Sequence, residues 1–426
     1  MRFALLVPVL ALLLPCPDSP AEEWSRFRGP NGNGISTATG LPITWTEEDY
    51  RWQVDLPVQG SSSPVLWDGK IFLTGDDSST GTRSVLCVDA ENGRTLWRRD
   101  YEFEGYYLHR DNDFASATPC VDEHGVIVAW STPEQILMIA LDLEGGEQWR
   151  RDLGPYRGLH GSGSSPIIAD GLIVLANDQL KPDRFSFYLP DKRDTIPGES
   201  FLIALERKTG ETRWKIDRKS ELAGYATPCI RRVGDRTEVI FTSTAHGITA
   251  VDLQSGEISW EIDGLWDDRT VSSPQLHGDL VFGSFGQGLA GQRFVAVRPE
   301  KPGSKQGELV YDVTRSVPLV PSFVVKDDLL FLWTDSGVVT CLDAATGEVH
   351  WRERVDGDFY SSPVWIEGRL YGISKRGEVV VLAASKEFEE LGRVDLGEKT
   401  FATPAIGNGV IYLRTQTRLL ALGKKP

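Results

Sequence analysis

The side chains of this sequence that could do chemistry are concentrated in polar segments between residues 109 and 269. Histidine, carboxylate and basic groups are the types that hold a metal ion or orient a polar ligand. The alternative is that they are solvated loop residues, engaged in local ion pairs and Asx turns. The candidates are His109, Arg110, Asp111, Asn112, Asp113, His160, Asp178, Lys181, Arg184, Asp267, Asp268 and Arg269.

Other chemical motifs lack the context that their chemistry needs. Residues 286–291 (GQGLAG) match G-x-G-x-x-G, but a strand-like segment follows, whereas a dinucleotide fingerprint opens a helix. Residues 160–165 (HGSGSS) are rich in Gly and Ser but lack the lysine of a phosphate-binding loop. The chain contains neither H-E-x-x-H nor G-x-S-x-G, so no motif in the sequence indicates a zinc peptidase or a serine hydrolase.

Four cysteines stand alone in the chain beyond residue 21. Cys87, Cys120, Cys229 and Cys341 lack the C-x-x-C and C-x-x-C-H spacings of zinc, thioredoxin and c-type haem sites. Cys87 and Cys341 occupy one slot of the repeat described below, and Cys120 and Cys229 another, in non-adjacent units. Such positions are far apart, so we expect four free thiols.

Residues 1–21 have the pattern of a signal peptide. Arg2 supplies the positive charge, residues 3–14 form the apolar core, and small residues precede a cleavage site after Ala21. The apolar run is too short for a transmembrane helix, and no later stretch approaches the required length. We therefore expect an exported protein, periplasmic or extracellular. A lipoprotein anchored at Cys16 is the alternative.

The composition indicates a folded protein with an acidic surface. Of the 426 residues, 40% are hydrophobic and 25% are charged, as in ordinary globular chains. The 61 acidic and 45 basic residues give a net charge of −16, which repels the phosphates of nucleic acids and anionic lipids. The charge therefore argues against a nucleic-acid partner.

A repeat organises the chain. Each unit begins with a small residue, Ser or Thr, and Pro, continues through two apolar strands, and ends in L-D-x-x-x-G-x-x-x-W. Copies such as SSPVLWDGKIFLTG and SSPIIADGLIVLAN align directly. The opening prolines are Pro64, Pro119, Pro166, Pro228, Pro274, Pro321, Pro363 and Pro404.

The units predict a closed ring of sheets. Period-two alternation and DG, NG, SG and TG turns favour four short strands in each of the eight units. The eighth unit lacks its closing strand, whereas residues 46–57 have the character of one, with Trp52 in the aromatic slot. We therefore predict an all-β, single-domain eight-bladed β-propeller of four-stranded antiparallel blades over residues 46–426, closed by this N-terminal strand.

Closing aromatic residues and an N-terminal arm complete this prediction. A large ring on the outermost strand can cover the gap between neighbouring blades. We assign this docking role to Trp52, Trp97, Trp149, Trp214, Trp260, Tyr311 and Trp351. Residues 22–45 form the arm, for which two roles are open: a peptide that docks a partner, or a segment packed along the propeller rim.

Propeller topology assigns the longest loops to one face. Loops between second and third strands lie on the same face as the connections between blades. The insertions there are residues 101–116, 154–163, 176–199 and 284–293. The opposite face has short hairpins apart from residues 299–307. Long loops grouped on one face are typical of a binding surface, and His109 and His160 would point from it toward the central channel.

The repeat resembles a known family. The unit x-A-L-D-x-x-T-G-x-x-x-W after an S-S-P-x-x-x-x-G strand is similar to the pyrroloquinoline-quinone (PQQ) repeat, also called the tryptophan-docking motif. Over roughly residues 24–426 the chain resembles secreted bacterial PQQ-binding-like β-propeller repeat proteins, including their opening WSRFRGPNGNGIS. The same blades occur in quinoprotein alcohol dehydrogenases and in the propeller lipoprotein that assists outer-membrane protein assembly.

The resemblance implies PQQ and calcium as candidate cofactors. Quinoprotein dehydrogenases usually carry two adjacent cysteines, joined in a disulfide ring that stacks on the quinone. They also use a Glu, an Asn and an Asp to hold calcium, and a catalytic Asp. This sequence has no adjacent cysteine pair, and the calcium set has no counterpart that can be matched residue by residue. The cofactor stays open, and an enzyme is the less favoured interpretation.

The favoured interpretation is an exported binding or scaffold module. The resemblance to the assembly lipoprotein implies protein partners in the cell envelope, bound to the long-loop face as an extended strand or a loop. A PQQ- and calcium-dependent oxidoreductase of alcohols or sugars is the first alternative. A carbohydrate-binding propeller is the second, with stacking aromatics Tyr106, Tyr107, Phe185, Phe187 and Tyr188.

Overall fold

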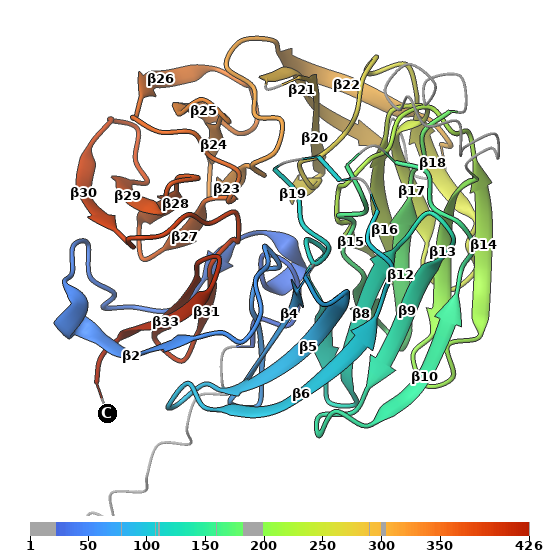
Figure 1. Ribbon diagram of the computed structural model, residues 1–426. Helices are drawn as coiled ribbons and strands as arrows, with labels where there is room; N and C mark the ends of the chain where they lie inside the picture. Colours follow the sequence, from blue (N-terminus) through green and yellow to red (C-terminus); the bar gives the residue numbers. More distant parts are fainter. Residues whose placement is uncertain are drawn as a thin grey trace, which may run out of the picture.

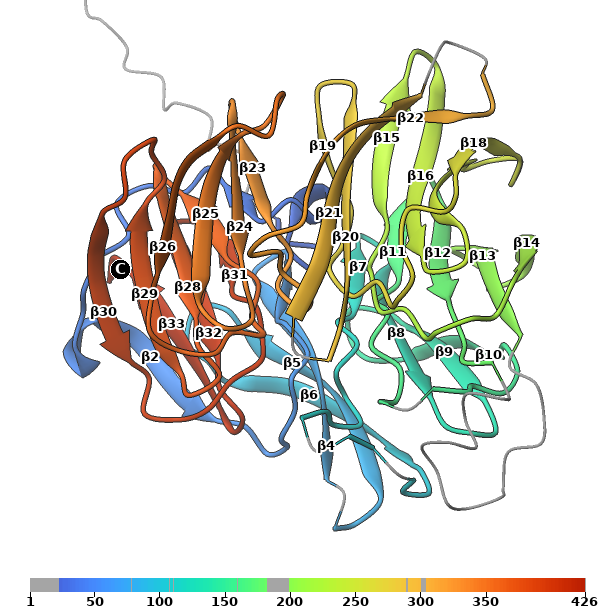
Figure 2. The same ribbon diagram turned by 90° about the horizontal axis from the view of Figure 1, so that it is seen from above.

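The strands form a ring of eight blades around a central channel. The computed structural model describes residues 23–425, apart from residues 78, 107, 110, 159, 182–198, 289 and 300–303. Residues 1–21, the expected signal peptide, and Cys16 lie outside the described residues. The described strands make eight sheets of four antiparallel strands, one with an added fifth strand (Figures 1 and 2). The predicted eight-bladed β-propeller is confirmed.

Each blade runs from a short inner strand to an outer strand. Blades 1 to 4 comprise β3 (Val65–Trp67), β4 (Lys70–Asp77), β5 (Thr82–Asp89), β6 (Thr95–Glu102); β7 (Cys120–Asp122), β8 (Gly125–Ser131), β9 (Ile136–Leu141), β10 (Glu147–Asp152); β11 (Ile167–Ala169), β12 (Leu172–Asn177), β13 (Ser200–Glu206), β14 (Thr212–Arg218); and β15 (Cys229–Val233), β16 (Arg236–Ser243), β17 (Gly247–Asp252), β18 (Ile258–Ile262). Blades 5 to 8 comprise β19 (Gln275–His277), β20 (Leu280–Gln287), β21 (Ala290–Pro299), β22 (Gly307–Val313); β23 (Val324–Lys326), β24 (Leu329–Trp333), β25 (Val338–Asp343), β26 (Val349–Arg354); β27 (Val364–Ile366), β28 (Arg369–Ile373), β29 (Glu378–Ala383), β30 (Glu390–Asp395); and β31 (Ala405–Gly407), β32 (Val410–Arg414), β33 (Arg418–Gly423), β2 (Tyr50–Asp55).

The sequence of each strand follows its distance from the axis. The middle strand β12 (LIVLAN) is buried along its whole length, because neighbouring blades cover both of its faces. The outer strand β10 (EQWRRD) buries Trp149 and exposes its charged residues. Charged side chains on an outer strand discourage pairing with another chain. Within the described residues, no helix has the length and apolar character needed to cross a membrane.

The N-terminal strand closes the ring. β2 pairs antiparallel with β33, with Tyr50 opposite Leu422 and Asp55 opposite Arg418. In Figure 1 the blue β2 therefore lies beside the red β33. The outermost strand of blade 8 comes from the opposite end of the chain, as the repeat pattern predicted.

Aromatic residues on the outer strands lie on the next blade. The indole N–H of Trp97 donates to the carbonyl of Leu143 at 2.8 Å, and the ring lies directly against Gly145, where a Cβ atom would clash. The same type of hydrogen bond joins Trp52 to Ala90, Trp149 to Arg207, Trp214 to Leu253, Tyr311 to Ala344 and Trp351 to Ser385. The ring of Trp260 also lies against the next blade, at Gly307, but its buried indole N–H has no hydrogen-bond partner among the described residues. Each pair therefore fixes one blade against its neighbour.

The first part of the N-terminal arm crosses the channel, and its second part packs outward along blade 7, in keeping with the rim position that was one of its two expected roles. Trp24 forms a β-bridge with Leu66, and β1 (Ile35–Ser36) adds a parallel fifth strand to β27. Arg28 is fully buried and donates to the carbonyl of Phe323 at 2.8 Å. These partners belong to inner strands or to the residues that open them. The first part of the arm thus crosses from blade to blade near the short-hairpin end of the channel. Along the second part, Arg369 donates to the carbonyl of Leu41, Tyr371 donates to the carbonyl of Pro42, and Thr44 lies against Gly392 of the outermost strand β30.

One predicted insertion is a strand extension. Residues 284–293 were expected to form a long loop, but β20 continues to Gln287 and β21 begins at Ala290, so most of this segment is a hairpin. The four cysteines are buried and free, as expected from their slots, and burial raises the pKa of each thiol to about 12.

Candidate ligand site at the channel mouth

A ring of hydroxyl side chains surrounds the channel where the inner strands begin. The ring residues are Ser63, Thr118, Ser165, Thr227, Ser273, Ser322, Ser362 and Thr403. At seven of these positions the backbone N–H donates to the hydroxyl oxygen of the next blade, at 2.9–3.1 Å. Each such oxygen already accepts a backbone N–H. No acceptor for the proton of these hydroxyl groups is found among the described residues.

The start of the sixth unit differs from the one that the repeat pattern predicts. Pro321 was expected to open the sixth unit, by analogy with the other prolines. Ser322 instead holds the ring position, and Phe323 stands where the other units have proline. The unit therefore opens two residues later than the sequence pattern suggested.

A second tier of side chains lies two residues before the ring. Side chains alternate along an extended segment, so positions two apart face the same side, here the channel. In blades 1 to 3 the tier consists of Ser61, Ser116 and Gly163. In blades 4 to 8 it consists of Tyr225, Val271, Val320, Tyr360 and Phe401. One side of the channel is thus small and polar, and the other is apolar and aromatic.

The two tiers enclose a continuous recess that opens on the long-loop face. Its lower part, about 170 Å³, reaches Phe27 of the N-terminal arm. Its upper part, about 240 Å³, is bounded by loop residues that include His109 and His160. The two parts share lining residues of the second tier, among them Tyr225 and Tyr360. The arm therefore forms the floor, and the long-loop face forms the mouth.

Two histidines and an arginine form one wall of the mouth. The rings of His109 and His160 are 4.7 Å apart in an edge-to-face arrangement. Burial, followed by the charge of Arg269, lowers the pKa of His160 to about 4, so this imidazole is neutral at pH 7. Its Nε2 lies 2.6 Å from Arg269 Nη1 and can accept a hydrogen bond from it. The Nε of Arg269 is buried and has no hydrogen-bond partner among the described residues.

An acid, a phenol and a lysine form the opposite wall. Asp111 Oδ2 lies 3.3 Å from both the Tyr360 hydroxyl and Lys375 Nζ. Burial opposes ionisation of Asp111, but the hydrogen bond and charge of Lys375 outweigh it and lower the pKa of Asp111. Lys375 Nζ also lies 4.1 Å from the centroid of the Tyr360 ring, which packs against Phe401. The aromatic face is thus held in place by its neighbours.

A buried carboxylate supports the apolar wall. Asp335 accepts the backbone N–H groups of Leu319 at 2.7 Å and Val320 at 3.1 Å. Burial raises the pKa of Asp335 to about 6, although both hydrogen bonds favour the ionised form. This contact fixes the connection that carries Val320 into the recess.

The structure brings together only some of the residues expected from sequence. His109, Asp111, Asn112, His160 and Arg269 line the upper recess. Arg110 and Arg184 lie outside the described residues.

The other expected residues lie away from the recess lining. Asp113 accepts a hydrogen bond from Ser61 beside the channel, and Asp178 is buried against Ser243. Lys181 pairs with Glu221 at the edge of the face. Asp267 is exposed, and Asp268 caps the backbone N–H of Arg269.

Of the expected stacking aromatics, Tyr106 is engaged by its neighbours. Tyr106 packs against Phe114 with ring centroids 5.0 Å apart, and its hydroxyl donates to the carbonyl of Ser131. Tyr107, Phe185, Phe187 and Tyr188 lie outside the described residues.

Sequence reasoning missed Tyr225, Asp335, Tyr360, Lys375 and Phe401. Three of these were accessible from the repeat. Tyr225, Tyr360 and Phe401 each stand three residues before an opening proline, and alternation from the ring position places them in the channel. Asp335 and Lys375 occupy equivalent positions, each two residues after the second strand of its blade, but the residue type at this position differs between units, so no repeated signal marks them.

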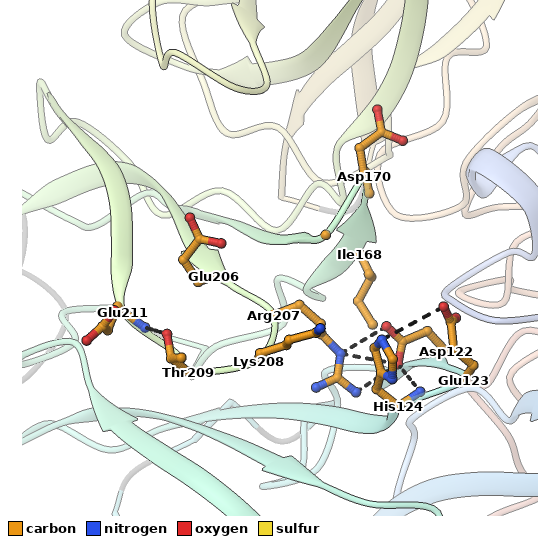
Figure 3. Close-up of a pocket in the computed structure, with 12 residues that line it drawn as sticks. Asp122, Glu123, His124, Ile168, Asp170, Glu206, Arg207, Lys208, Thr209 and Glu211 are labelled. Atoms are coloured by element: carbon orange, nitrogen blue, oxygen red, sulfur yellow. Dashed lines mark hydrogen bonds and ion pairs between the residues drawn. The ribbon is translucent and has the colours of Figure 1, made fainter.

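A second cavity lies on the opposite face, between blades 2 and 3. It measures about 780 Å³ and is lined by hairpin residues such as His124 and Glu211 (Figure 3). Its central arginine, Arg207, is committed to a bidentate contact with Asp122, as the dashed lines in Figure 3 show. The charges here stabilise the junction between two blades, and the channel mouth is the better candidate site.

The recess does not fit PQQ with calcium. Among the described residues, no group of three or more His, Cys, Asp or Glu could hold a metal ion. Asp111 and Asp335 are already engaged by Lys375 and by backbone N–H groups. We therefore derive no reaction through a quinone.

Solved structures share the fold at low sequence identity. The BamB protein of Moraxella catarrhalis is 15% identical, with a TM-score of 0.60 over 88% of this chain and 98% of that chain. The quinohemoprotein alcohol dehydrogenase of Comamonas testosteroni is 11% identical, with a TM-score of 0.67 over 95% and 82%. A europium-containing methanol dehydrogenase is 11% identical, with a TM-score of 0.52 over 96% and 99%. These similarities establish the architecture only.

A family model gives the closer assignment. No curated protein matches the sequence. The model described as outer membrane protein assembly factor BamB matches residues 46–184, 81–306 and 301–424, so the matches together span nearly all of the propeller. Overlapping matches are expected of a chain built from one repeated unit. The chain therefore belongs to the PQQ-like β-propeller family of the outer membrane protein assembly factor BamB.

Proposed function

We propose that this protein is an exported binding module that holds a protein partner of the cell envelope against its long-loop face. The observation that carries this proposal is the asymmetry of the channel. The arm fills one end, with Arg28 bonded to the carbonyls of Phe323 and Pro363. The other end is an open recess with varied chemistry. The name of the family, an outer membrane protein assembly factor, supports an envelope partner.

The outer rim favours a loop rather than an added strand as the bound element. Outer strands such as β6 (TLWRRDYE), β10 (EQWRRD) and β26 (VHWRER) carry charged residues at most of their exposed positions, and Leu96 and Val349 are the exposed apolar residues of β6 and β26. Strand addition needs an accessible, weakly charged edge. We therefore expect the partner to present a loop to the long loops that surround the mouth.

Site-specific photo-crosslinking in intact cells tests this proposal. A photoreactive residue replaces Asp267 or Asp358, two exposed residues on connections of the long-loop face. The matched control replaces Asp235, which is exposed on the hairpin between β15 and β16. We expect both long-loop positions to crosslink the same envelope protein and Asp235 to give no such adduct. Equal products from all three positions, or none from the long-loop face, would contradict the proposal.

Calorimetry tests the enzymatic alternative separately. PQQ and calcium are titrated together into the purified protein, and the heat of binding is followed. We expect no saturable heat. Saturable binding at about 1 μM would favour a quinone-dependent oxidoreductase instead.

A further inference from the structure

The recess in the channel has two unlike sides. Blades 4 to 8 contribute the rings of Tyr225, Tyr360 and Phe401 together with Val271 and Val320. Blades 1 to 3 contribute small or polar groups, and the loops above them add Asp111, Asn112 and the two histidines. A ligand that fits must therefore present an apolar face on one side and hydrogen-bonding groups on the other.

The hydroxyl ring adds groups that can both donate and accept. Seven ring residues line the lower recess, and their side chains are nearly inaccessible to solvent. Seven ring oxygens accept a backbone N–H, and the structure records no acceptor for ring O–H groups within its described residues. Buried donors of this kind find a partner in most proteins. A ligand rich in hydroxyl groups could supply such partners.

The charges around the mouth favour a neutral ligand. Arg269 and Lys375 are balanced by Asp111 and Asp335, and Lys375 already contacts Asp111. His160 faces Arg269. An anionic ligand would approach both carboxylates, and a cationic ligand would approach both basic groups. Arg269 retains one buried, unpartnered N–H that a neutral acceptor oxygen could take.

We infer that the channel mouth binds a neutral sugar, one monosaccharide unit at a time, with an apolar face of the sugar ring against the aromatic side of the recess, which Tyr225, Tyr360 and Phe401 form, and its hydroxyl groups toward Arg269 and the hydroxyl ring. Stacking of C–H groups on an aromatic face, beside side chains that fix orientation, matches the general anatomy of polar-ligand pockets. The recess is too small for an extended oligosaccharide to enter along its whole length. This inference does not depend on the proposed protein partner, which would contact the surrounding loops.

Saturation-transfer NMR with a panel of neutral monosaccharides tests the inference directly. The panel includes glucose, galactose and mannose, with glucuronate as the charged probe and a disaccharide as the glycan probe. We expect at least one neutral monosaccharide to bind with a Kd of about 1 mM or tighter. The disaccharide should show saturation transfer to its terminal ring only. Absence of binding across the panel, or tighter binding of glucuronate, would overturn the inference.

Two variants connect the binding to the recess. Tyr360→Ala removes the central aromatic face, and we expect it to weaken sugar binding about tenfold. Phe401→Ala removes the adjacent ring and should also weaken sugar binding. This second variant keeps the test decisive if Tyr360→Ala fails to fold. Thr209→Ala, on the opposite face, is the matched control and should leave binding unchanged. Sugar binding that is insensitive to both aromatic substitutions would place the site elsewhere and overturn the inference.

Discussion

At the scale of single residues, burial sets the chemistry of the long-loop face. Asp76, Asp178 and Asp335 are buried carboxyls whose pKa burial raises to about 6. Burial likewise lowers the pKa of His160 to about 4. Each shift favours the neutral form of the group, as expected where water is excluded. At pH 7 His160 is therefore neutral, whereas the three carboxyls are still mostly ionised because the pH lies above their pKa of about 6.

The pH dependence of stability tests this description at Asp178. An acid whose pKa is raised on folding stabilises the folded state below its unfolded pKa of about 4, and this contribution is lost as the pH rises through about 6. Asp178→Asn keeps an acceptor for Ser243 but cannot ionise. We expect the variant to gain stability relative to the wild type between about pH 4 and 7, by at most about 3 kcal/mol.

Thermal unfolding measured across this pH range gives the comparison. Asp267→Asn, at an exposed position, is the control and should show a difference from the wild type that does not change with pH. If the difference in stability between Asp178→Asn and the wild type were also independent of pH, the pKa of Asp178 would not be raised on folding.

The residues of the candidate site could be predicted only where the repeat determines on which face or side of a blade a side chain lies. His160 and Arg269 were found because polar residues in connections between blades must lie on one face. The position of the Tyr360 side chain could be predicted from the alternation of side chains along the segment, once Ser362 is known to face the channel. Asp335 could not be found, because its role depends on backbone N–H groups of a connection whose path the sequence does not specify.

At the scale of elements, the docking of each outer strand on the next blade holds the ring together. The Trp214 ring lies against Gly256, and its N–H donates to the Leu253 carbonyl at 2.8 Å. Trp214→Phe removes this hydrogen bond and should reduce the free energy of unfolding by about 1–2 kcal/mol. Trp214→Ala also leaves a cavity and should cost about 3–5 kcal/mol.

Urea unfolding measures both losses. Trp67→Phe on the inner strand β3 serves as the control, because Trp67 is only half-buried and lies outside the docking positions. If Trp214→Phe and Trp67→Phe were equally mild, the hydrogen bond between blades would contribute nothing measurable to stability.

The elements also show why the blades were easier to predict than the arm. Alternation and tight turns are local signals, and eight copies reinforce one another. The arm has no such periodicity, and its path is set by distant partners: Asn31 exchanges two hydrogen bonds with the backbone of Ile230. Its buried arginines are stabilised by carbonyl groups that only the assembled ring provides.

At the scale of the whole molecule, the closed ring depends on contact between the two ends of the chain. β2 supplies the outer strand of blade 8, and Trp52 then docks on blade 1 through Ala90. Without β2, blade 8 would expose β33, and the junction with blade 1 would lose its docking residue. Ring closure therefore requires that both chain ends fold together.

Moving the closing strand tests this dependence. Because Tyr50 lies opposite Leu422, and β33 ends at Gly423, a short hairpin can join β33 to a relocated copy of residues 46–57. We expect deletion of residues 23–57 to lower the melting temperature sharply, and the relocated strand to recover only the part of the loss that ring closure contributes, because the contacts of the arm, such as those of Arg28, are not restored. A relocated copy with Trp52→Ala is the matched control and should recover less, because the docking contact on Ala90 is absent. Equal recovery with and without Trp52, or no loss on deletion, would show that the ring closes independently of this strand.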